Sequence, residues 1–398
     1  MRDMAMPRTP VCIAGIGVVS AAGADVPATL NTFATGRRNP SNSLPFESTI
    51  ACPTFQVDAD LPILPPQYNN CRSLRLTMHA VRQALEDSAI SRFDSATRVG
   101  ICIGTTVASQ LNNIPFYSAY RRDPNLPLDP VIDYLHANLA RAVGDLLHTA
   151  GPRMTIVNAC SSGTDAIGVA SSWINSGLCD IAIAGGGDEL SRVAIAGFWS
   201  LGVMSSQPCA PFDRDRSGLN LGEGAGILIL ESAAHAERRR KSHRFEIAGF
   251  GAACDAHHLT APHPEGRGLD AAIRTALSQA QIEPNQVAFL NAHGTATADN
   301  DRAEGKVINR VFGPNVPFLS TKGFTGHTLG AAGGIEAVFT ILGLLGCWVP
   351  ASPGFENQSD DIPIAPTRAR TAIRGEYAMS TSLAFGGNNS VVLIRRIA

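Results

Sequence analysis

A chain of 398 residues, 44% of them hydrophobic and 17% charged, is long enough to bury a sizeable core as one large or two medium domains. The formal net charge of −2 argues against a nucleic-acid partner, because proteins that bind phosphate backbones usually carry a clear basic excess or face. Nine cysteines without framework spacing favour a reducing compartment, and without any CxxC pair the sequence gives no support for a metal site.

Two stretches resemble targeting or membrane segments. Arg2 and Arg8 precede VCIAGIGVVSAAGA, which has the length and small-residue end of a signal peptide, but the cysteine usage favours a first buried strand and a glycine-rich turn. The uncharged run 337–355 approaches membrane length, but its glycines and prolines fit a buried helix that passes into a strand. We therefore expect a cytoplasmic protein without a membrane partner.

Along the chain, apolar runs typical of buried strands alternate with stretches of helical periodicity. Strands that are apolar on both faces are typical of parallel or mixed sheets covered by helices, so the sequence predicts an α/β fold. Residues 40–70, rich in Ser, Pro and Asn, are predicted to be loop. The predicted strands are VCIAGIGVV, RVGICIG, MTIVNA, CDIAIAGG, GAGILILES, FEIAGFGA, QVAFLNAHG, VPFLST, GCWVPAS and SVVLIRR.

These runs divide into two similar sets of five. In each set a strand leads into a small-residue turn and a helix, ACSSGTDAIGVASSWINSG in the first and KGFTGHTLGAAGGIEAVFTILG in the second. The repetition predicts an internal duplication, with an N-terminal half over residues 1–244 and a C-terminal half over residues 245–398. The charged segment HAERRRKSHR, residues 235–244, is predicted to join the halves and to form a solvated face.

Cys160 lies where the strand-like run MTIVNA ends and a helix-like run begins. The neighbouring Ser161, Ser162 and Gly163 suit a tight turn and a helix start, whereas a structural cysteine is more typical of the strand itself. Unpaired N–H groups and the positive end of a helix dipole lower the pKa of a thiol. We therefore interpret Cys160 as a nucleophile, with its own N–H placed to face a developing oxyanion.

Two histidines follow other predicted strands. His293 comes directly after VAFL in a glycine-containing loop, which is where open α/β sheets place functional groups. Lys322 lies five residues before His327, and Glu336 lies in the helix beyond, so a buried ion pair between Lys322 and Glu336 is compatible with the spacing. One cysteine with two histidines at corresponding strand ends indicates a shared active site. A papain-like thiol hydrolase would use only one of these histidines, and the second would need another role.

Five motifs, in this order along essentially the whole chain, closely resemble those of the elongating β-ketoacyl-acyl carrier protein synthases. They are NACSSG, PFDRDRSGLNLGEGAG, NAHGTATADND, STKGFTGHTLGAAGG and LAFGGNN. The resemblance implies a thiolase-like, five-layer α/β/α/β/α fold made of two related halves, usually a homodimer. It also implies an acyltransferase activity, the decarboxylative Claisen condensation of an acyl thioester with malonyl-acyl carrier protein.

The resemblance assigns roles to the candidate residues. Cys160 is implied to accept the acyl group as a thioester. His293 and His327 are implied to donate from Nε2 to the enolate that forms when the malonyl group loses carbon dioxide. Lys322 matches an active-site lysine with an electrostatic and structural role, and Glu336 is its expected partner.

The same resemblance covers the substrate path. Phe385 matches a gating aromatic residue, and the backbone N–H groups of Cys160 and Phe385 are implied to form an oxyanion hole. Thr295 and Thr297 match residues that hydrogen-bond the phosphopantetheine arm. That arm belongs to the carrier protein, so no bound cofactor is expected. The run GIGVVSAAG is similar to a dinucleotide fingerprint, but Ser20 takes the place of its third glycine.

The expected partners are an acyl carrier protein and a second subunit. Because the carrier protein is acidic, its docking face on this chain should be basic. Arg72 and Arg75 are the residues that we expect there, with Arg121 and Arg122 or the run RRRK as competitors. The chain is expected to form a homodimer, or a heterodimer with a ketosynthase-like subunit.

Three other functions are compatible with parts of this pattern. A degradative thiolase would need a second cysteine in a CxG context, whereas Cys347 lies in GCWVP; a non-catalytic chain-length partner would lack the cysteine nucleophile that Cys160 supplies. A ketosynthase of a specialised polyketide or aryl polyene pathway, paired with a chain-length-factor subunit, would run the same chemistry. Ala384 where glycine is usual, and Asn388-Asn389 where Thr-Asn is usual, leave the preferred acyl chain open.

Overall fold

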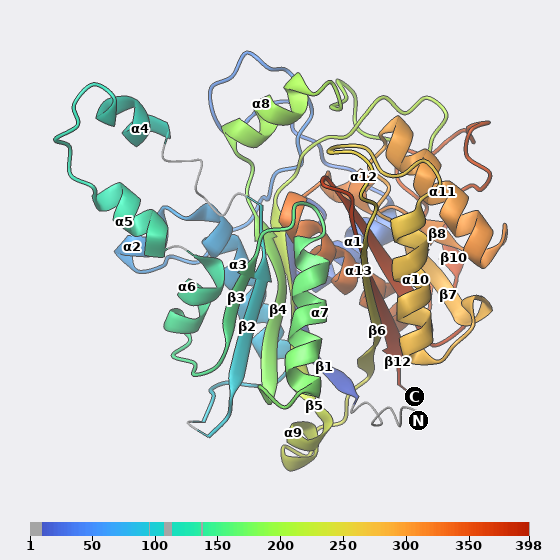
Figure 1. Cartoon of the computed structure of the whole chain (residues 1–398), viewed down its shortest axis with the longest axis horizontal. Helices are drawn as coiled ribbons and strands as arrows, with labels where there is room; N and C mark the ends of the chain where they lie inside the picture. Colours follow the sequence, from blue (N-terminus) through green and yellow to red (C-terminus); the bar gives the residue numbers. More distant parts are fainter. Residues whose placement is uncertain (1–9, 95, 107–113, 137, 398) are drawn as a thin grey trace.

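The computed structural model of the chain describes residues 10–94, 96–106, 114–136 and 138–397. In this part of the chain a ten-stranded mixed sheet has the order β3-β2-β4-β5-β1-β6-β12-β11-β7-β8 (Figure 1). Its strands are β1 (Val11–Ser20), β2 (Val99–Gly104), β3 (Arg153–Ile156), β4 (Ile181–Asp188), β5 (Gly224–Ser232), β6 (Phe245–Cys254), β7 (Val287–Asn291), β8 (Phe318–Leu319), β11 (Tyr377–Ala384) and β12 (Asn388–Arg396).

The sheet consists of two five-stranded parts with the same topology. The order β3-β2-β4-β5-β1 in the first part is repeated as β8-β7-β11-β12-β6 in the second. In both parts the two outermost pairs are parallel and the two inner pairs antiparallel. The parts meet where Val11–Ile13 of β1 pairs antiparallel with Phe245–Ile247 of β6. This repetition supports the duplication; the division after residue 244 stays a prediction.

Helices cover both parts of the sheet and also separate them. Two helices, α7 (Ser162–Asn175) and α13 (Ala332–Gly346), lie between the parts and contact strands of both. On the outer faces, α3 (Arg72–Asp87) and α6 (Leu139–Leu146) cover the first part, and α10 (Arg267–Ala280) and α11 (Ala298–Phe312) lie on the outer side of the second. Three buried apolar clusters fill the spaces between these layers. The predicted five-layer α/β/α/β/α fold is thereby confirmed.

The remaining elements are short. They are α1 (Val26–Thr35), α2 (Pro66–Asn69), α4 (Ile114–Tyr120), α5 (Asp129–His136), α8 (Arg192–Ser200), α9 (Ala233–Arg238), the 3₁₀ helices Pro284–Gln286 and Leu329–Ala331, α12 (Lys322–Thr325), β9 (Trp348–Val349) and β10 (Thr371–Ala372). Figure 1 shows α4 and α5 on an arm that extends away from the sheet, and α8 above the ends of the central strands.

Glycines allow the two central helices to pack closely. A Cβ on Gly163 of α7 would lie 2.8 Å from the carbonyl oxygen of Gly330, and a Cβ on Gly333 of α13 would lie 2.1 Å from Oγ1 of Thr164. Side chains at these positions would force the helices apart. The segment Leu329–Gly346 is apolar and long enough to cross a membrane, but 89% of it is buried, as in the core helix of a soluble protein. The predicted passage from helix to strand is present, because β9 follows α13 after the αL residue Cys347.

One predicted strand is shorter than expected and lies outside the main sheet, and one strand was missed. GCWVPAS forms only the short β9, which pairs with β10 outside the main sheet. The fifth strand in the second part of the main sheet is instead β11, whose run Ser380-Thr381-Ser382 is polar yet buried. Hydrogen bonds replace apolar contacts there: the hydroxyl of Ser382 lies 2.8 Å from that of Thr164, and Thr381 donates to Glu304 over 2.7 Å.

The expected solvated face at residues 235–244 was also partly wrong. His235, Arg239 and His243 turn inward to the buried carboxylate of Glu231 at the end of β5, with Arg239 Nε 2.8 Å from Oε1. Burial alone would raise the pKa of Glu231, but these three side chains, with hydrogen bonds from His235 and Arg239, lower it to about 2. Part of the charge run therefore anchors the connection between the halves.

Candidate active site

A strained turn presents Cys160 between β3 and α7. Ala159 has a φ of 50°, a left-handed conformation that costs energy for a residue with a side chain. The turn is held by Ser162, whose hydroxyl accepts from the backbone N–H of Asn158 over 2.8 Å and donates to the carbonyl of Ala159 over 2.6 Å. These bonds fix the direction in which Cys160 leaves the strand.

Asp165, in the first turn of α7, also fixes the turn between β3 and α7 that carries Cys160. Its carboxylate accepts from Asn158 Nδ2 over 2.6 Å and from the hydroxyl of Ser161 over 2.8 Å. It also accepts from the hydroxyl of Ser390 on β12. The nucleophile turn of the first half is therefore tied to a strand of the second half. This network was not predicted from the sequence, although an acidic residue in the first turn of a helix is a common signal for it.

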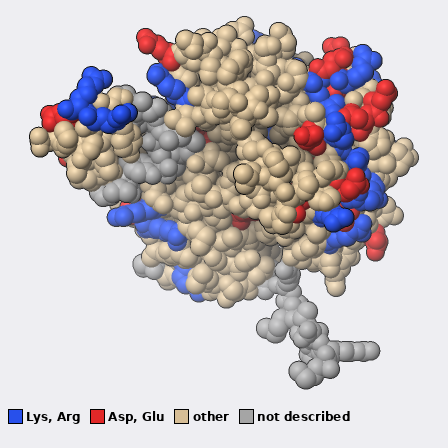
Figure 2. Space-filling model, turned by 45° about the horizontal axis from the view of Figure 1, so that its top comes forward, with Lys and Arg blue, Asp and Glu red and all other residues tan. Residues whose placement is uncertain are grey.

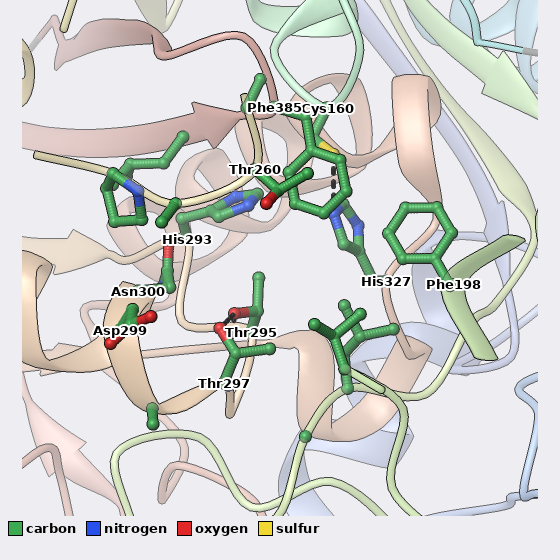
Figure 3. Close-up of a pocket in the computed structure, with 18 of the residues that line it drawn as sticks. Cys160, Phe198, Thr260, His293, Thr295, Thr297, Asp299, Asn300, His327 and Phe385 are labelled. Carbon is green, nitrogen blue, oxygen red and sulfur yellow. Dashed lines mark hydrogen bonds between the residues drawn. The ribbon is translucent and has the colours of Figure 1, made fainter. Parts of the chain in front are cut away.

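Cys160, His293 and His327 meet in one buried pocket of about 370 Å³ (Figure 3). The Sγ of Cys160 lies 3.0 Å from Nε2 of His327. The rings of His293 and His327 are 5.1 Å apart between centroids and nearly perpendicular, at 86°. The three side chains come from three different strand ends, so the fold brings together residues that are up to 167 positions apart in the sequence.

Hydrogen bonds fix which nitrogen of each imidazole carries the proton. The backbone N–H of Leu329 donates to Nδ1 of His327 over 3.2 Å. The ammonium group of Lys322 lies 3.0 Å from Nδ1 of His293, and because an ammonium can only donate, this nitrogen accepts. In both neutral rings the proton is consequently on Nε2. Both histidines can donate a hydrogen bond from Nε2 toward a substrate oxygen.

The two imidazoles are held neutral. Burial is the main cause that lowers the pKa of His293 and of His327 well below 6.5, and the positive charge of Lys322 lowers both further. A neutral imidazole with its proton on Nε2 is a hydrogen-bond donor that does not change charge near pH 7. Such a pair stabilises negative charge that develops on a substrate oxygen.

Lys322 forms the ion pair with Glu336 that the sequence left open. The ammonium contacts the Glu336 carboxylate and donates to the carbonyl oxygen of His293 over 2.7 Å. Burial raises the pKa of Glu336 to about 7, while the charge and hydrogen bond of Lys322 act in the opposite direction. Among the described residues no group hydrogen-bonds to Oε2 of Glu336. The pair places one positive charge directly behind the imidazole of His293.

The expected low pKa of the Cys160 thiol is not found. Burial raises this pKa to about 12, although the charge of Lys322 and a hydrogen bond from the backbone N–H of Phe385 lower it. Removal of the sulfur from water outweighs the effect of the helix terminus, and this removal does not show in the sequence. In this pocket the buried sulfur is a neutral thiol, and the groups around it stabilise a thiolate only as the proton leaves.

Phe385, Thr295 and Thr297 line the same pocket. The ring of Phe385 stacks on Phe198 of α8, with centroids 5.4 Å apart and an angle of 23°. The hydroxyls of Thr295 and Thr297 lie 2.8 Å apart and face each other at the wall of the pocket (Figure 3). Phe198 was missed from the sequence, because nothing in the run GFWSL distinguishes this aromatic residue from its neighbour.

Glu304 on α11 holds the loop that carries His293. Its buried carboxylate accepts the backbone N–H groups of His293 and Gly294, each over 2.8 Å. Burial raises the pKa of Glu304, and these hydrogen bonds lower it in part. The role of Glu304 was not predicted from the sequence either, although a carboxylate on the apolar face of an amphipathic helix indicates a specific internal partner.

The two arginines expected at a docking face lie outside the pocket and are engaged within the chain. Arg72 on α3 forms a bidentate salt bridge with Glu223, in which Nε of Arg72 lies 2.8 Å from Oε2 of Glu223. Arg75 donates to the carbonyl oxygens of Leu61 and Pro62 over 3.2 and 3.1 Å. The charge of Arg72 is therefore offset by a buried carboxylate, which does not favour a role in binding an acidic partner.

The layered scaffold of two repeated halves is the fold of the thiolase-like proteins. The thiol and the two donor imidazoles in its pocket place this chain among the thiolase-like proteins that condense acyl groups. Residues 8–236 match the family model for the N-terminal domain of β-ketoacyl synthases, and residues 244–356 match the model for their C-terminal domain. The chain belongs to the β-ketoacyl synthase family.

Curated relatives agree with this assignment. The chain is 36% identical over 339 residues to 3-oxoacyl-[acyl-carrier-protein] synthase 2 of Staphylococcus aureus strain N315, covering 81% of this chain and 82% of the relative. It is 34% identical to the enzyme with the same name from Vibrio cholerae serotype O1, covering 79% of this chain and 80% of the relative.

Solved structures are similar over almost the whole chain. The ishigamide ketosynthase/chain length factor has a TM-score of 0.91 at 27% identity and covers 98% of this chain and 100% of that one. The ketosynthase ApeO in complex with its chain length factor ApeC, from Xenorhabdus doucetiae, has a TM-score of 0.83 at 32% identity and covers 98% of both chains.

Proposed function

We propose that this chain condenses an acyl group held on Cys160 with malonyl-acyl carrier protein, giving β-ketoacyl-acyl carrier protein in fatty acid synthesis. The observation that carries this proposal is the contact of 3.0 Å between the Cys160 sulfur and Nε2 of His327, with the ring of His293 beside it in the same buried pocket. A thiol hydrolase would need a water site and one histidine, whereas this pocket holds two imidazoles that both donate from Nε2.

The first step is acyl transfer from the carrier protein. The sulfur of Cys160 attacks the carbonyl carbon of the acyl thioester, and the bond between that carbon and the pantetheine sulfur breaks. The proton of the Cys160 thiol leaves with the carrier thiol. Nε2–H of His327, the N–H of Phe385 and the charge of Lys322 stabilise the sulfur while it is negative. The N–H groups of Cys160 and Phe385 form the oxyanion hole for the carbonyl oxygen.

The second step forms the carbon–carbon bond. The malonyl group loses carbon dioxide, and the electron pair of the broken bond becomes an enolate whose oxygen accepts hydrogen bonds from His293 and His327. The enolate carbon attacks the acyl carbonyl on Cys160, and the carbon–sulfur bond breaks. The sulfur leaves as a thiolate and takes up a proton from solvent, which balances the charge of the lost carboxylate.

The remaining pocket residues position these groups. Lys322, paired with Glu336, keeps the proton of His293 on Nε2. Thr295 and Thr297, on the pocket wall, hydrogen-bond the phosphopantetheine arm that the carrier protein brings, so the chain itself needs no bound cofactor. Phe385, stacked on Phe198, moves to admit the acyl chain.

A second subunit completes the enzyme at the edge of the sheet. Within the described residues β3 pairs on one side only, with β2, and Met154 and Val157 at this edge expose apolar side chains. An unpaired strand edge with exposed apolar residues is favourable for pairing with another chain. We propose a homodimer that works in the cytoplasm, with a heterodimer as the alternative.

A specialised polyketide or aryl polyene pathway is the second candidate function. It is favoured by the likeness to the ishigamide ketosynthase/chain length factor and to ApeO with its chain length factor ApeC. The chemistry at Cys160 is the same, so only the acyl substrate and the second subunit distinguish the two functions.

Intact-protein mass spectrometry with a panel of saturated and polyunsaturated acyl-carrier substrates tests the proposal. We expect one acyl adduct that is absent in Cys160→Ala, and a β-ketoacyl product once malonyl-carrier protein is added. An adduct that persists in Cys160→Ala would contradict the assignment of the nucleophile. A preference for polyunsaturated chains together with a need for a second protein would select the specialised pathway.

A further inference from the structure

The hydrogen bond that fixes the tautomer of His327 depends on a strained turn. Leu329, whose backbone N–H donates to Nδ1 of His327 over 3.2 Å, has a φ of 54°, a left-handed conformation that is unfavourable for a leucine. Such a conformation persists only where neighbouring contacts hold it. A contact on the far side of Leu329 is therefore needed to keep this N–H aimed at the imidazole.

Asp188, the last residue of β4, supplies that contact. Its Oδ2 accepts the backbone N–H of Gly330, the residue after Leu329, over 2.7 Å. The same oxygen accepts the backbone N–H and the hydroxyl of Thr106, each over 2.8 Å, and Oδ1 accepts the hydroxyl of Thr105 over 2.6 Å. The carboxylate is completely buried. It ties the ends of β2 and β4 in the first half to the turn at Gly330 in the second.

Close packing leaves Gly330 little room to move away from Asp188. A Cβ on Gly330 would lie 2.6 Å from the backbone of Thr105, and a Cβ on Gly186 of β4 would lie 2.3 Å from the carbonyl oxygen of Gly330. Contacts this close fix the turn against the ends of β2 and β4. The hydrogen bond to Asp188 and the packing around Gly330 therefore hold the same backbone position.

The charge of Asp188 serves the interior of the protein. Figure 2 shows that the middle of the face over this end of the sheet is broadly uncharged, whereas Lys and Arg gather at the tip of the arm and at the opposite side. Burying a carboxylate costs free energy, and the negative charge of Asp188 is one of the causes that raise the pKa of Cys160. A carboxylate with no task at this position would only be a disadvantage to the nucleophile.

We propose that Asp188 is a positioning residue for His327. By holding the turn at Gly330 it keeps the N–H of Leu329 on Nδ1 of His327, so that the proton of the imidazole stays on Nε2. This inference rests on the proposed function, in which Nε2–H of His327 stabilises both the Cys160 thiolate and the enolate oxygen. Asp188 acts through the backbone of the turn and needs no contact with the substrate.

Two substitutions separate the hydrogen bonds of Asp188 from its charge. In Asp188→Asn the amide oxygen can accept both backbone N–H groups, and the amide NH2 can donate to the hydroxyl oxygen of Thr105, so the turn is held without the charge. In Asp188→Ala the N–H of Gly330 loses its acceptor, and the strained conformation of Leu329 is released. Gly330→Ala breaks the same contact from the other side, because its Cβ pushes the turn away from Thr105. It is the second variant if Asp188→Ala does not fold.

Two measurements report on His327 and not only on stability. We expect condensation by Asp188→Ala and by Gly330→Ala to slow about 10²-fold, as for one lost oxyanion donor, with KM for malonyl-carrier protein within a fewfold of wild type. Asp188→Asn should keep its rate within a fewfold. Nitrogen NMR of protein with labelled histidine should show the His327 proton on Nε2 in wild type and in Asp188→Asn, and a mixture of tautomers in the other two variants. His327→Ala assigns the signal.

A matched control lies at the other end of the same strand. Asp180 directly precedes β4, and its carboxylate accepts from the backbone N–H of Arg98 over 3.2 Å and from the Arg98 guanidinium over 3.1 Å. The length of β4 places Asp180 about 25 Å from Asp188. Asp180→Ala removes a hydrogen-bonded carboxylate from the same strand, so it should lower stability without changing condensation or the tautomer of His327.

Three results would overturn this role of Asp188. They are an unchanged tautomer of His327 in Asp188→Ala and Gly330→Ala, an equal loss of condensation in Asp180→Ala, which would make general destabilisation the cause, and an equal loss in Asp188→Asn, which would make the charge the cause. If wild-type protein forms no product with malonyl-carrier protein, the proposed function fails instead, and the tautomer of His327 still tests Asp188.

Discussion

In the first half of the molecule the strand that ends at Ile156 leads to a thiol, and in the second half the equivalent strand that ends at Leu319 leads to a lysine and a histidine. The strand orders and orientations of the halves match pair by pair. The central helices α7 and α13 follow the same two strands. The duplication supplies one repeated scaffold, and the residues at equivalent strand ends determine what each half contributes.

A second pair of equivalent strands shows the same division. After β2, Thr105 and Thr106 donate from their hydroxyls to buried Asp188, over 2.6 and 2.8 Å. After β7, the equivalent position carries His293, which reaches the pocket. One strand end is therefore used to hold the structure together and the other to supply a donor. In the proposed mechanism, a site assembled in this way has its nucleophile in one half and its enolate donors in the other.

The largest expected effect separates the chemistry of the two halves. His293→Ala should leave acylation of Cys160 within a fewfold of the wild-type rate, because the imidazole hydrogen-bonded to the sulfur is that of His327. The same variant should slow condensation by about 10²- to 10³-fold, the usual cost of one lost oxyanion donor. Intact mass measures the first step, and product formation measures the second. Equal losses in both steps would show that the division between halves is not functional.

The contact between the central helices tests the structural side of the comparison. Gly333→Ala would place a Cβ 2.1 Å from Oγ1 of Thr164, so we expect the free energy of unfolding to fall by about 1–3 kcal/mol. Gly197 on α8 is the matched control, because a Cβ there meets nothing within 4 Å; Gly197→Ala should be neutral or stabilise by up to about 1 kcal/mol. Chemical denaturation measures both. Equal effects in the two variants would mean that the halves are not closely packed at Gly333.

The repeated scaffold could be predicted from the sequence because it depends on short-range signals. Apolar runs of β-branched residues mark most of the strands, and the small-residue turns before α7 and α13 mark the equivalent helices. β11 was missed because the buried hydroxyls of Ser380, Thr381 and Ser382 make its sequence similar to that of a loop. The burial of Thr381 and Ser382 is balanced by hydrogen-bond partners that come from other elements, which a single segment does not reveal.

The site could be predicted only as far as its residue types. Cys160, His293 and His327 stand out because each follows a strand, and the structure brings them into one pocket. Two quantities could not be read from the sequence. The pKa of Cys160 depends on complete burial of the sulfur, and the tautomer of His327 depends on one backbone N–H, that of Leu329.

A single hydrogen bond between the halves beside the pocket has a smaller expected effect. Asn388 Nδ2 at the start of β12 donates to Oδ1 of Asn158 over 2.6 Å, which links the loop after Phe385 to the nucleophile turn. A double-mutant cycle with Asn158→Ala and Asn388→Ala should give a coupling free energy of about 0.5–1.5 kcal/mol in unfolding experiments. The cycle is needed because Asn158 also donates to Asp165. A coupling of zero would mean that the two halves are not connected through this pair.

The smallest expected effect concerns the acid limb of the pH–rate profile for condensation. Because both imidazoles have a pKa well below 6.5, wild-type enzyme should keep its rate as pH falls from 8 to 6. Replacing the ion pair as a whole, in Lys322→Met/Glu336→Leu, removes the charge that helps to lower these pKa values and also the titrating group of Glu336, without leaving a lone buried charge. The acid limb should then move up toward 6.5, with a loss of up to about fourfold for each histidine at pH 6 relative to pH 8. A limb that stays in place would show that burial alone keeps the histidines neutral, and that Lys322 of the second half acts only by holding the ring of His293 in position.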